Sequence, residues 1–403
     1  MQAQQYDVVI VGGAMSGCCL ALALAQGLPE LRLAIIEKNP PQAANRHQQK
    51  CGFDARSIAL SHGSCQTLQQ IRVDTNTSLW QNIAPLAEDI RQIHISDCGH
   101  AGLVDLSAQE LNLSRLGAVV ELSAVGAVLL KAIAQQANID YLAPCTVTQI
   151  ERSTEKVNLR LSNHQHLETP LLIAADGTQS AVAKQCGIQY QILNDYQQSA
   201  VIANVKSTQA HHGRAFERFT AQGPLALLPL KNDRLSLVWC LKQADDVMVL
   251  DDQAFLQRLQ RQFGWRLGRF EQVGKRVAYP LALQQAERAI HHRLAVIGNA
   301  AQTLHPIAGQ GFNLGLRDVA DLAKVLIEAA RQGQDLGESA VLQRYRQRRQ
   351  ADQHNIINLT DGLVNTFAND LLPMQIGRNL GLLGLSHSLA LRQQFIKPTL
   401  GWV

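Results

Sequence analysis

The chain has 403 residues, of which 46% are hydrophobic and 17% charged, and its formal net charge is +4. This composition supports a large folded core and excludes a disordered chain. The positive charge is too small and too scattered to indicate nucleic-acid binding. No stretch reaches the roughly 18 consecutive apolar residues that span a bilayer. Residues 1–6 carry no export signal and the eight cysteines show no metal-ligand spacing, so we expect a cytoplasmic protein without a metal site.

Residues 6–37 predict a strand, a helix and a second strand. The segment 6–11 is almost entirely apolar and β-branched, which is typical of a strand buried on both faces. Glycines follow, then a helix of small residues over 15–26 and a strand over 32–37. This βαβ unit predicts the first half of a doubly wound parallel sheet.

The rest of the chain predicts two kinds of structure. A polar loop is predicted over 39–51, helical periodicity over 57–71 and 119–136, buried strands over 171–175 and 294–298, a long helix over 311–332 and further helices from 342. Residues 190–285 differ, because their strands alternate and enclose one helix near 252–263. We therefore predict an α/β fold: a doubly wound Rossmann-like domain, an inserted mixed β-sheet domain and C-terminal helices.

A glycine-rich turn follows the first strand. In a dinucleotide site one glycine forms the tight turn, a second lets the backbone approach pyrophosphate, and a third lets the helix pack on the strand. Gly12 and Gly17 fit the first and third roles, but Ala14 adds a methyl group at the second. Glu37 ends the second strand, where a carboxylate binds ribose hydroxyls. The candidate nucleotide-binding residues are Gly12, Gly13, Ala14, Gly17, Glu37 and Lys38.

Two later motifs also follow buried strands. Asp176 and Gly177 come directly after the strand at 171–175, and alone they indicate only a turn. The segment 298–313 is a stronger signal, because a strand end, a proline-containing loop and a Gly-Gln-Gly sequence open a long helix. The N-terminus of that helix offers N–H donors and positive potential to a ligand. Its candidate ligand-binding residues are Asn299, Gly309, Gln310, Gly311, Phe312 and Asn313.

In this order and spacing, the three motifs resemble those of the flavoprotein aromatic hydroxylases of the para-hydroxybenzoate hydroxylase type, over nearly the whole chain. The resemblance implies that the first motif binds the ADP half of FAD. It implies that Asp176 and Gly177 lie near the pyrophosphate and the nicotinamide donor, and that the third motif holds the ribityl chain and the flavin ring. The family usually has Asp where this chain has Asn299, whose amide still donates and accepts hydrogen bonds.

Within that family, further stretches resemble the ubiquinone-biosynthesis hydroxylases. These stretches are 53–60, 215–219, 223–229, 263–268 and 305–318. The resemblance implies that NAD(P)H reduces FAD, that reduced FAD and O2 form a C4a-hydroperoxide, and that a prenylated phenol is hydroxylated. It also implies contact with other enzymes of ubiquinone biosynthesis. Peripheral contact with the inner membrane and a homo-oligomer are both left open.

The resemblance divides the chain into three parts. We expect an FAD-binding domain from 1–75, 115–185 and 286–345, a substrate domain from 76–114 and 186–285, and a C-terminal helical region from 346–403. The apolar stretch 371–400 is either a helix packed on the flavin domain or the border of the route taken by the prenyl tail.

His305 and Pro306, in the loop before the long helix, are the candidate catalytic residues, with a packing role for His305 as the alternative. By resemblance, Arg56 lies beside the cofactor's phosphates or the nicotinamide path; the alternative is a simple surface cation. Three other functions stay open. They are hydroxylation at another ring position, a flavin reductase or dehydrogenase, and a scaffold that has lost its flavin, an idea that Ala14 supports.

Overall fold

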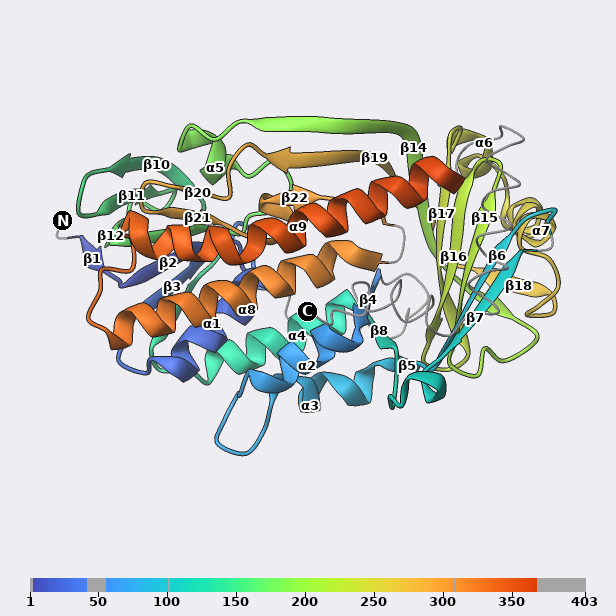
Figure 1. Cartoon of the computed structure of the whole chain (residues 1–403), viewed down its shortest axis with the longest axis horizontal. Helices are drawn as coiled ribbons and strands as arrows, with labels where there is room; N and C mark the ends of the chain where they lie inside the picture. Colours follow the sequence, from blue (N-terminus) through green and yellow to red (C-terminus); the bar gives the residue numbers. More distant parts are fainter. Residues whose placement is uncertain (1–2, 42–55, 101, 307–308, 368–403) are drawn as a thin grey trace.

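The computed structural model describes residues 3–41, 56–100, 102–306 and 309–367. They form the predicted α/β fold, with two large sheets toward opposite ends of the long axis and two long helices running beside them (Figure 1). Most of the predicted loop at 39–51 and the whole apolar stretch 371–400 lie outside the described residues.

The first sheet has six strands in the order β20-β21-β13-β2-β3-β9. Their bounds are β2 (Val8–Val11), β3 (Leu33–Ile36), β9 (Ile139–Leu142), β13 (Leu171–Ala174), β20 (Ile290–His291) and β21 (Leu294–Val296). All neighbours pair in parallel except β20 with β21. Because both faces of this sheet are covered, its central strands β13, β2 and β3 are apolar and buried along their whole length.

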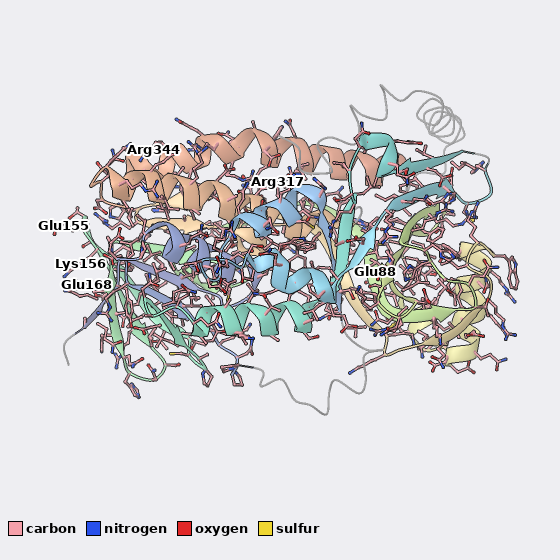
Figure 2. The ribbon with its side chains drawn as sticks, turned by 90° about the horizontal axis from the view of Figure 1, so that it is seen from below. Glu88, Glu155, Lys156, Glu168, Arg317 and Arg344 are labelled. Carbon is pink, nitrogen blue, oxygen red and sulfur yellow. The ribbon has the colours of Figure 1, made fainter. Side chains whose placement is uncertain are left out.

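The two faces of this sheet are covered by different structures. On one face, residues such as Ile10 and Ile35 pack against α1 (Met15–Gly27), α4 (Leu122–Ala134) and α8 (Gln310–Arg331). On the other face, Val9 and Ile36 pack against a small sheet and α5. These elements are β1 (Gln4–Gln5), β10 (Val147–Arg152), β11 (Val157–Leu161), β12 (His166–Thr169) and α5 (Ala181–Gln185). At this end of the molecule Lys156 and Glu168 form a partly exposed ion pair of 2.8 Å (Figure 2).

The second sheet has nine strands, and β14 and β19 extend from it toward the first sheet (Figure 1). The order is β22-β19-β14-β17-β16-β15-β6-β7, with β18 also paired to β14. The bounds are β6 (Gln92–Asp97), β7 (Leu103–Ser107), β14 (Tyr190–Ser207), β15 (Arg214–Thr220), β16 (Gly223–Leu230), β17 (Arg234–Leu241), β18 (Phe270–Val273), β19 (Val277–Ala286) and β22 (Gln302–Thr303). One face packs Phe216 and Trp239 against α7 (Asp252–Phe263), beside the short α6 (Asp245–Met248).

The predicted helices at 57–71 and 119–136 were wrong in their first residues. Each begins as a strand, β4 (Ser57–Ser61) and β8 (Gly117–Glu121). The two strands pair with each other, and β8 also pairs with β5 (Glu88–Ile90), which makes a separate three-stranded sheet. Only then do α2 (His62–Gln70) and α4 begin, and the short α3 (Leu79–Ile83) packs beside them. The predictions for α1, α7 and α8 are confirmed within one or two residues.

Helix α9 (Ser339–Phe367) lies along α8 and is tied to it by buried charges (Figure 1). The Asp318 carboxylate, 0% exposed, accepts hydrogen bonds from Arg349 Nε at 2.8 Å, Gln353 Nε2 at 3.1 Å and the Gly298 N–H at 3.0 Å. Arg317, labelled in Figure 2, donates to Asp352 at 2.7 Å. None of the helices in the described part is both long and apolar enough to cross a membrane.

We predict that Arg349→Met lowers the free energy of unfolding by about 3–5 kcal/mol, because it leaves the Asp318 carboxylate buried without its cation. Urea unfolding followed by circular dichroism measures the loss. The matched control is Arg348→Met, since Arg348 forms only a half-exposed pair with Glu328 and is expected to contribute about 0–1 kcal/mol. Equal losses in the two variants would contradict the central role of Asp318.

Candidate active site

The three glycine motifs meet at the carboxyl ends of β2, β13 and β21. Gly12 has φ +116° and lies so close to the Ala175 carbonyl that a Cβ there would overlap it. Gly298, with φ +61°, faces the Ser16 side chain in the same way. The meeting of the motifs therefore rests on close contacts at Gly12 and Gly298 that leave no room for a Cβ in the present arrangement, and both residues have the positive φ that favours glycine.

The N-terminus of α1 presents backbone donors at this edge. Gly17 packs against the Gly12 carbonyl, which brings the helix close to the strand as predicted. Ala14 is the N-cap, exposed and extended with φ −86°, and its side chain makes no cap hydrogen bond. The first N–H groups of α1 therefore receive no hydrogen bond from a capping side chain at residue 14, and a helix N-terminus of this kind suits an anion.

Glu37 is held over the first motif by two sets of hydrogen bonds. Its Oε2 accepts from the Gly13 N–H at 2.8 Å, and its Oε1 accepts from the backbone and side chain of Asn39, both at 2.9 Å. A carboxylate oxygen has room for a second donor, so these bonds orient Glu37 without using all its acceptor capacity. Lys38 beside it is exposed.

Asp176 carries an unsatisfied buried acceptor. Its Oδ2 accepts a 3.3 Å hydrogen bond from the Val182 N–H, whereas its Oδ1 is buried and has no partner among the described residues. Such an acceptor costs roughly 1–3 kcal/mol unless a donor reaches it. Gly177 follows with φ +89°. The second motif thus has a place for a hydroxyl or N–H donor from a ligand.

The third motif ends at the N-terminus of α8. Gly309 is its N-cap, with φ +62° and no side-chain cap, so the N–H groups of Gln310, Gly311 and Phe312 have no cap partner. A Cβ on Gly311 would meet nothing within 4 Å, whereas Phe312 packs against the helical core. Asn299 is half-buried and makes no hydrogen bond within the described residues.

Asn313 has a structural role that the sequence did not reveal. Its Oδ1 accepts from the Ser61 N–H at 2.8 Å and the Ser64 hydroxyl at 2.7 Å. Its Nδ2 donates to the carbonyls of Ala59 at 3.1 Å and Gly309 at 2.7 Å. The amide therefore joins α8 to β4 and α2, which leaves it little capacity for a ligand. The side chain of Gln310 lies outside the described part.

His305 is fully buried against β14. Its ring meets Tyr196 edge to face with centroids 4.9 Å apart, and its Nε2 lies 3.4 Å from Gln198 Oε1. Burial lowers the pKa of His305 to about 4, so the ring is neutral at pH 7. Pro306 is half-buried, and its carbonyl accepts a 3.0 Å hydrogen bond from the Gly309 N–H.

Arg56 lies at the border with the second sheet. It is exposed, and its guanidinium donates a long, 3.5 Å hydrogen bond to the Tyr279 hydroxyl on β19. Among the described residues, the Arg56 side chain forms no hydrogen bond with the glycine motifs. Residues 53–55 and 307–308 of the sequence motifs lie outside the described part.

Comparisons with known proteins agree on one family and fold. The FAD binding domain family matches residues 5–360. The chain is 34% identical over 397 residues to the ubiquinone hydroxylase UbiL of Rhodospirillum rubrum, covering 98% of this chain and 89% of the relative. It is 31% identical over 407 residues to the 3-demethoxyubiquinol 3-hydroxylase of Escherichia coli, with full coverage of both. The crystal structure of p-nitrophenol 4-monooxygenase PnpA from Pseudomonas putida shares the fold, with TM-score 0.80, 17% identity and 98% of each chain covered.

We predict that His305 stabilises the fold only while it is neutral. Its pKa is about 4 in the folded protein and 6.5 when unfolded, so the unfolded chain binds more protons between these values. Stability due to His305 is therefore complete above pH 6.5 and falls by up to about 3 kcal/mol toward pH 4. His305→Gln should lose this pH dependence in unfolding experiments, whereas His166→Gln, at an exposed position, should keep it. Identical slopes in all three proteins would contradict the burial effect.

Proposed function

The chain belongs to the FAD binding domain family of flavin-dependent hydroxylases, and we propose that it converts 2-octaprenyl-6-methoxyphenol to 2-octaprenyl-6-methoxy-1,4-benzoquinol in ubiquinone biosynthesis. It is an FAD-dependent aromatic hydroxylase that uses NAD(P)H and O2. The observation that supports the cofactor's position most directly is the meeting of three glycine motifs beside the unpartnered Asp176 Oδ1. The assignments of the hydroxylated ring position and of the prenyl tail are supported by the sequence stretches that resemble a hydroxylase of this substrate.

The groups at the carboxyl edge fit FAD. We assign the diphosphate to the α1 N-terminus beside Gly12 and Gly17, and the adenosine ribose to Glu37. Asp176 would accept a hydroxyl of the ribityl chain, and the N–H groups at the start of α8 would face the flavin ring. Bound there, FAD supplies hydride acceptance from NAD(P)H and the transfer of one oxygen atom from O2. Residues 1–75, 115–185 and 286–345 then form the flavin-binding part.

The chain's own residues hold and shield this site. His305 packs on Tyr196 and anchors the loop before α8. Because His305 is neutral, it adds no charge beside the flavin ring. The start of α8 offers positive potential, which favours negative charge on a nearby ring edge. Protein packed around the reacting centre also excludes water, which protects reactive intermediates from hydrolysis.

Hydroxylation at another ring position is the second candidate. It is favoured by the Escherichia coli relative, a 3-demethoxyubiquinol 3-hydroxylase that matches this chain over its full length. For either position the substrate carries a prenyl tail. Removing each CH2 group from water stabilises the tail by about 0.8 kcal/mol, so the tail stays in a membrane or on a protein surface and does not enter water alone. We therefore propose a cytoplasmic protein that meets the inner membrane, or other enzymes of ubiquinone biosynthesis, at its surface.

We predict that Gly311→Val gives a folded protein without flavin. The added side chain begins in space that is open among the described residues, so we expect it to interfere with a ligand at the α8 N-terminus. The 450-nm absorbance per chain and the circular dichroism spectrum measure the two properties. Gly126→Val in α4 is the matched control, because its Cβ position is open too and lies on a different helix. Full flavin content in Gly311→Val would place the flavin elsewhere.

The substrate is tested by incubating the purified protein with NADPH, 18O2 and 2-octaprenyl-6-methoxyphenol in detergent. We expect one 18O atom in the product, para to the original hydroxyl, with one NADPH consumed for each product. The label at another carbon would favour the second candidate. NADPH oxidation without incorporation would indicate a reductase, and protein that binds no flavin would indicate a scaffold.

A further inference from the structure

The two faces of the nine-stranded sheet differ in burial. On the face toward α7, Phe216, Leu227 and Trp239 are buried, with Trp239 0% exposed. The opposite face carries a row of cross-strand neighbours that all stay partly exposed. In sheet order this row is Ile95, Glu217, Ala226, Val238, Ile202 and Val277. We call these six residues the open row.

The face that holds the open row continues toward the candidate active site. Next to it on the same face, Ala200, Cys240 and Leu281 pack against Tyr196, whose ring meets His305. Tyr279, paired with Ala200, reaches Arg56 at 3.5 Å. The open row therefore belongs to the face that leads to the loop before α8, and not to the outer surface beside α7.

Glu217 is the one carboxylate in the open row. It makes no hydrogen bond and no ion pair within the described ranges, and its neighbours in the row are apolar. Arg218 does not reach it, because its guanidinium donates to Gln262 O at 2.8 Å and Ser96 Oγ at 3.2 Å across the other face. A carboxylate in apolar surroundings costs free energy, and no hydrogen bond or ion pair from the described residues offsets that cost.

We propose that the open row is the floor on which the aromatic ring of the substrate lies, and that Glu217 accepts the hydrogen bond of its phenolic hydroxyl and takes its proton. The O–H bond breaks, the proton moves to a Glu217 carboxylate oxygen, and the electron pair stays on the phenolate oxygen. The more electron-rich ring is then the better nucleophile at its para carbon. This inference rests on the proposed aromatic hydroxylation and adds the residue that recognises and activates the phenol.

The chemistry of the row suits such a ligand. Apolar neighbours bind an aromatic ring and the first part of a prenyl tail, while a single acceptor selects for a hydroxyl. Burial raises the pKa of Glu217 to about 7, which brings it closer to that of a phenol, about 10, and strengthens it as a general base near neutral pH. The titratable groups on the same face are Cys240 of β17, whose pKa is raised by burial and by Glu217, Asp97 of β6, two residues beyond Ile95, and Tyr279 of β19. Tyr196 and His305 lie farther along this face, toward the loop before α8.

The hydrogen bond is tested without turnover by comparing how two ligands bind to wild type and to a Glu217 variant. The probes are 2-prenyl-6-methoxyphenol, with one isoprene unit, and its O-methyl ether, which lacks the donor. Binding to the flavin-loaded protein at pH 8 is followed by the absorbance change of the flavin. Wild type should bind the phenol about 10–100-fold more tightly than the ether. Glu217→Gln should remove most of that preference and leave ether binding and flavin content unchanged.

The controls separate this role from a structural one. Glu271→Gln, at an exposed carboxylate on β18 of the same sheet, should keep the preference, and Glu217→Asp should recover part of it. In wild type kcat/KM should fall as pH drops below about 7, where Glu217 becomes protonated, and Glu217→Gln should lack this limb. A preference that survives in Glu217→Gln, or equal weakening of both probes, overturns the proposal.

The outcomes also separate this inference from the proposed function. If wild type hydroxylates no prenylphenol but Glu217→Gln still abolishes the phenol preference, the proposed substrate fails and the binding role of Glu217 stands. If wild type gives the expected product and the preference is independent of residue 217, the function stands and the role of Glu217 fails.

Discussion

One buried carboxylate, that of Asp318, fixes the arrangement on which the site depends. It joins the left-handed Gly298 turn, helix α8 that bears it, and Arg349 of α9. A buried ion pair stabilises a fold only when nearly all its donors and acceptors are satisfied, so this junction tolerates few alternative geometries. The Gly298 turn leads to His305 and to the start of α8. Helix α9 carries no candidate catalytic residue, but through Arg349 and Asp318 it helps to fix the positions of His305 and of the α8 N-terminus.

The sequence was sufficient where the signal is local. The βαβ unit, α7 and α8 follow from periodicity and capping within a few residues, and the meeting of the glycine motifs follows because parallel strands end at one edge of a sheet. Strands β4 and β8 were missed, since a short apolar run beside a true helix fits either structure until its pairing partner is known. The strands over 147–169 were not predicted either, because they are short and rich in polar residues.

Long-range pairings account for the rest of what the sequence did not predict. Asp318 stands in a recognised motif, but only the fold shows that Arg349 and Gln353 reach it. Asn313 was predicted as a cofactor ligand, and the structure shows its amide used by the protein at every position. Glu217 also lay in a recognised stretch. Its unusual setting becomes visible only when strand register shows which face it shares, and with which neighbours.

The length of β14 has a consequence for recombination between relatives. This strand runs unbroken from Tyr190 to Ser207 and pairs with β19 along most of its course, so the nine-stranded sheet is not a detachable module. Any chimera that exchanges this sheet between relatives must cut both strands of this ribbon. The pairing is irregular at two places, between Ile192 and Asn194 and between Asp195 and Gln198. A seam placed at these bulges interrupts the fewest regular hydrogen bonds, and it lets an exchanged sheet keep its own register up to the boundary.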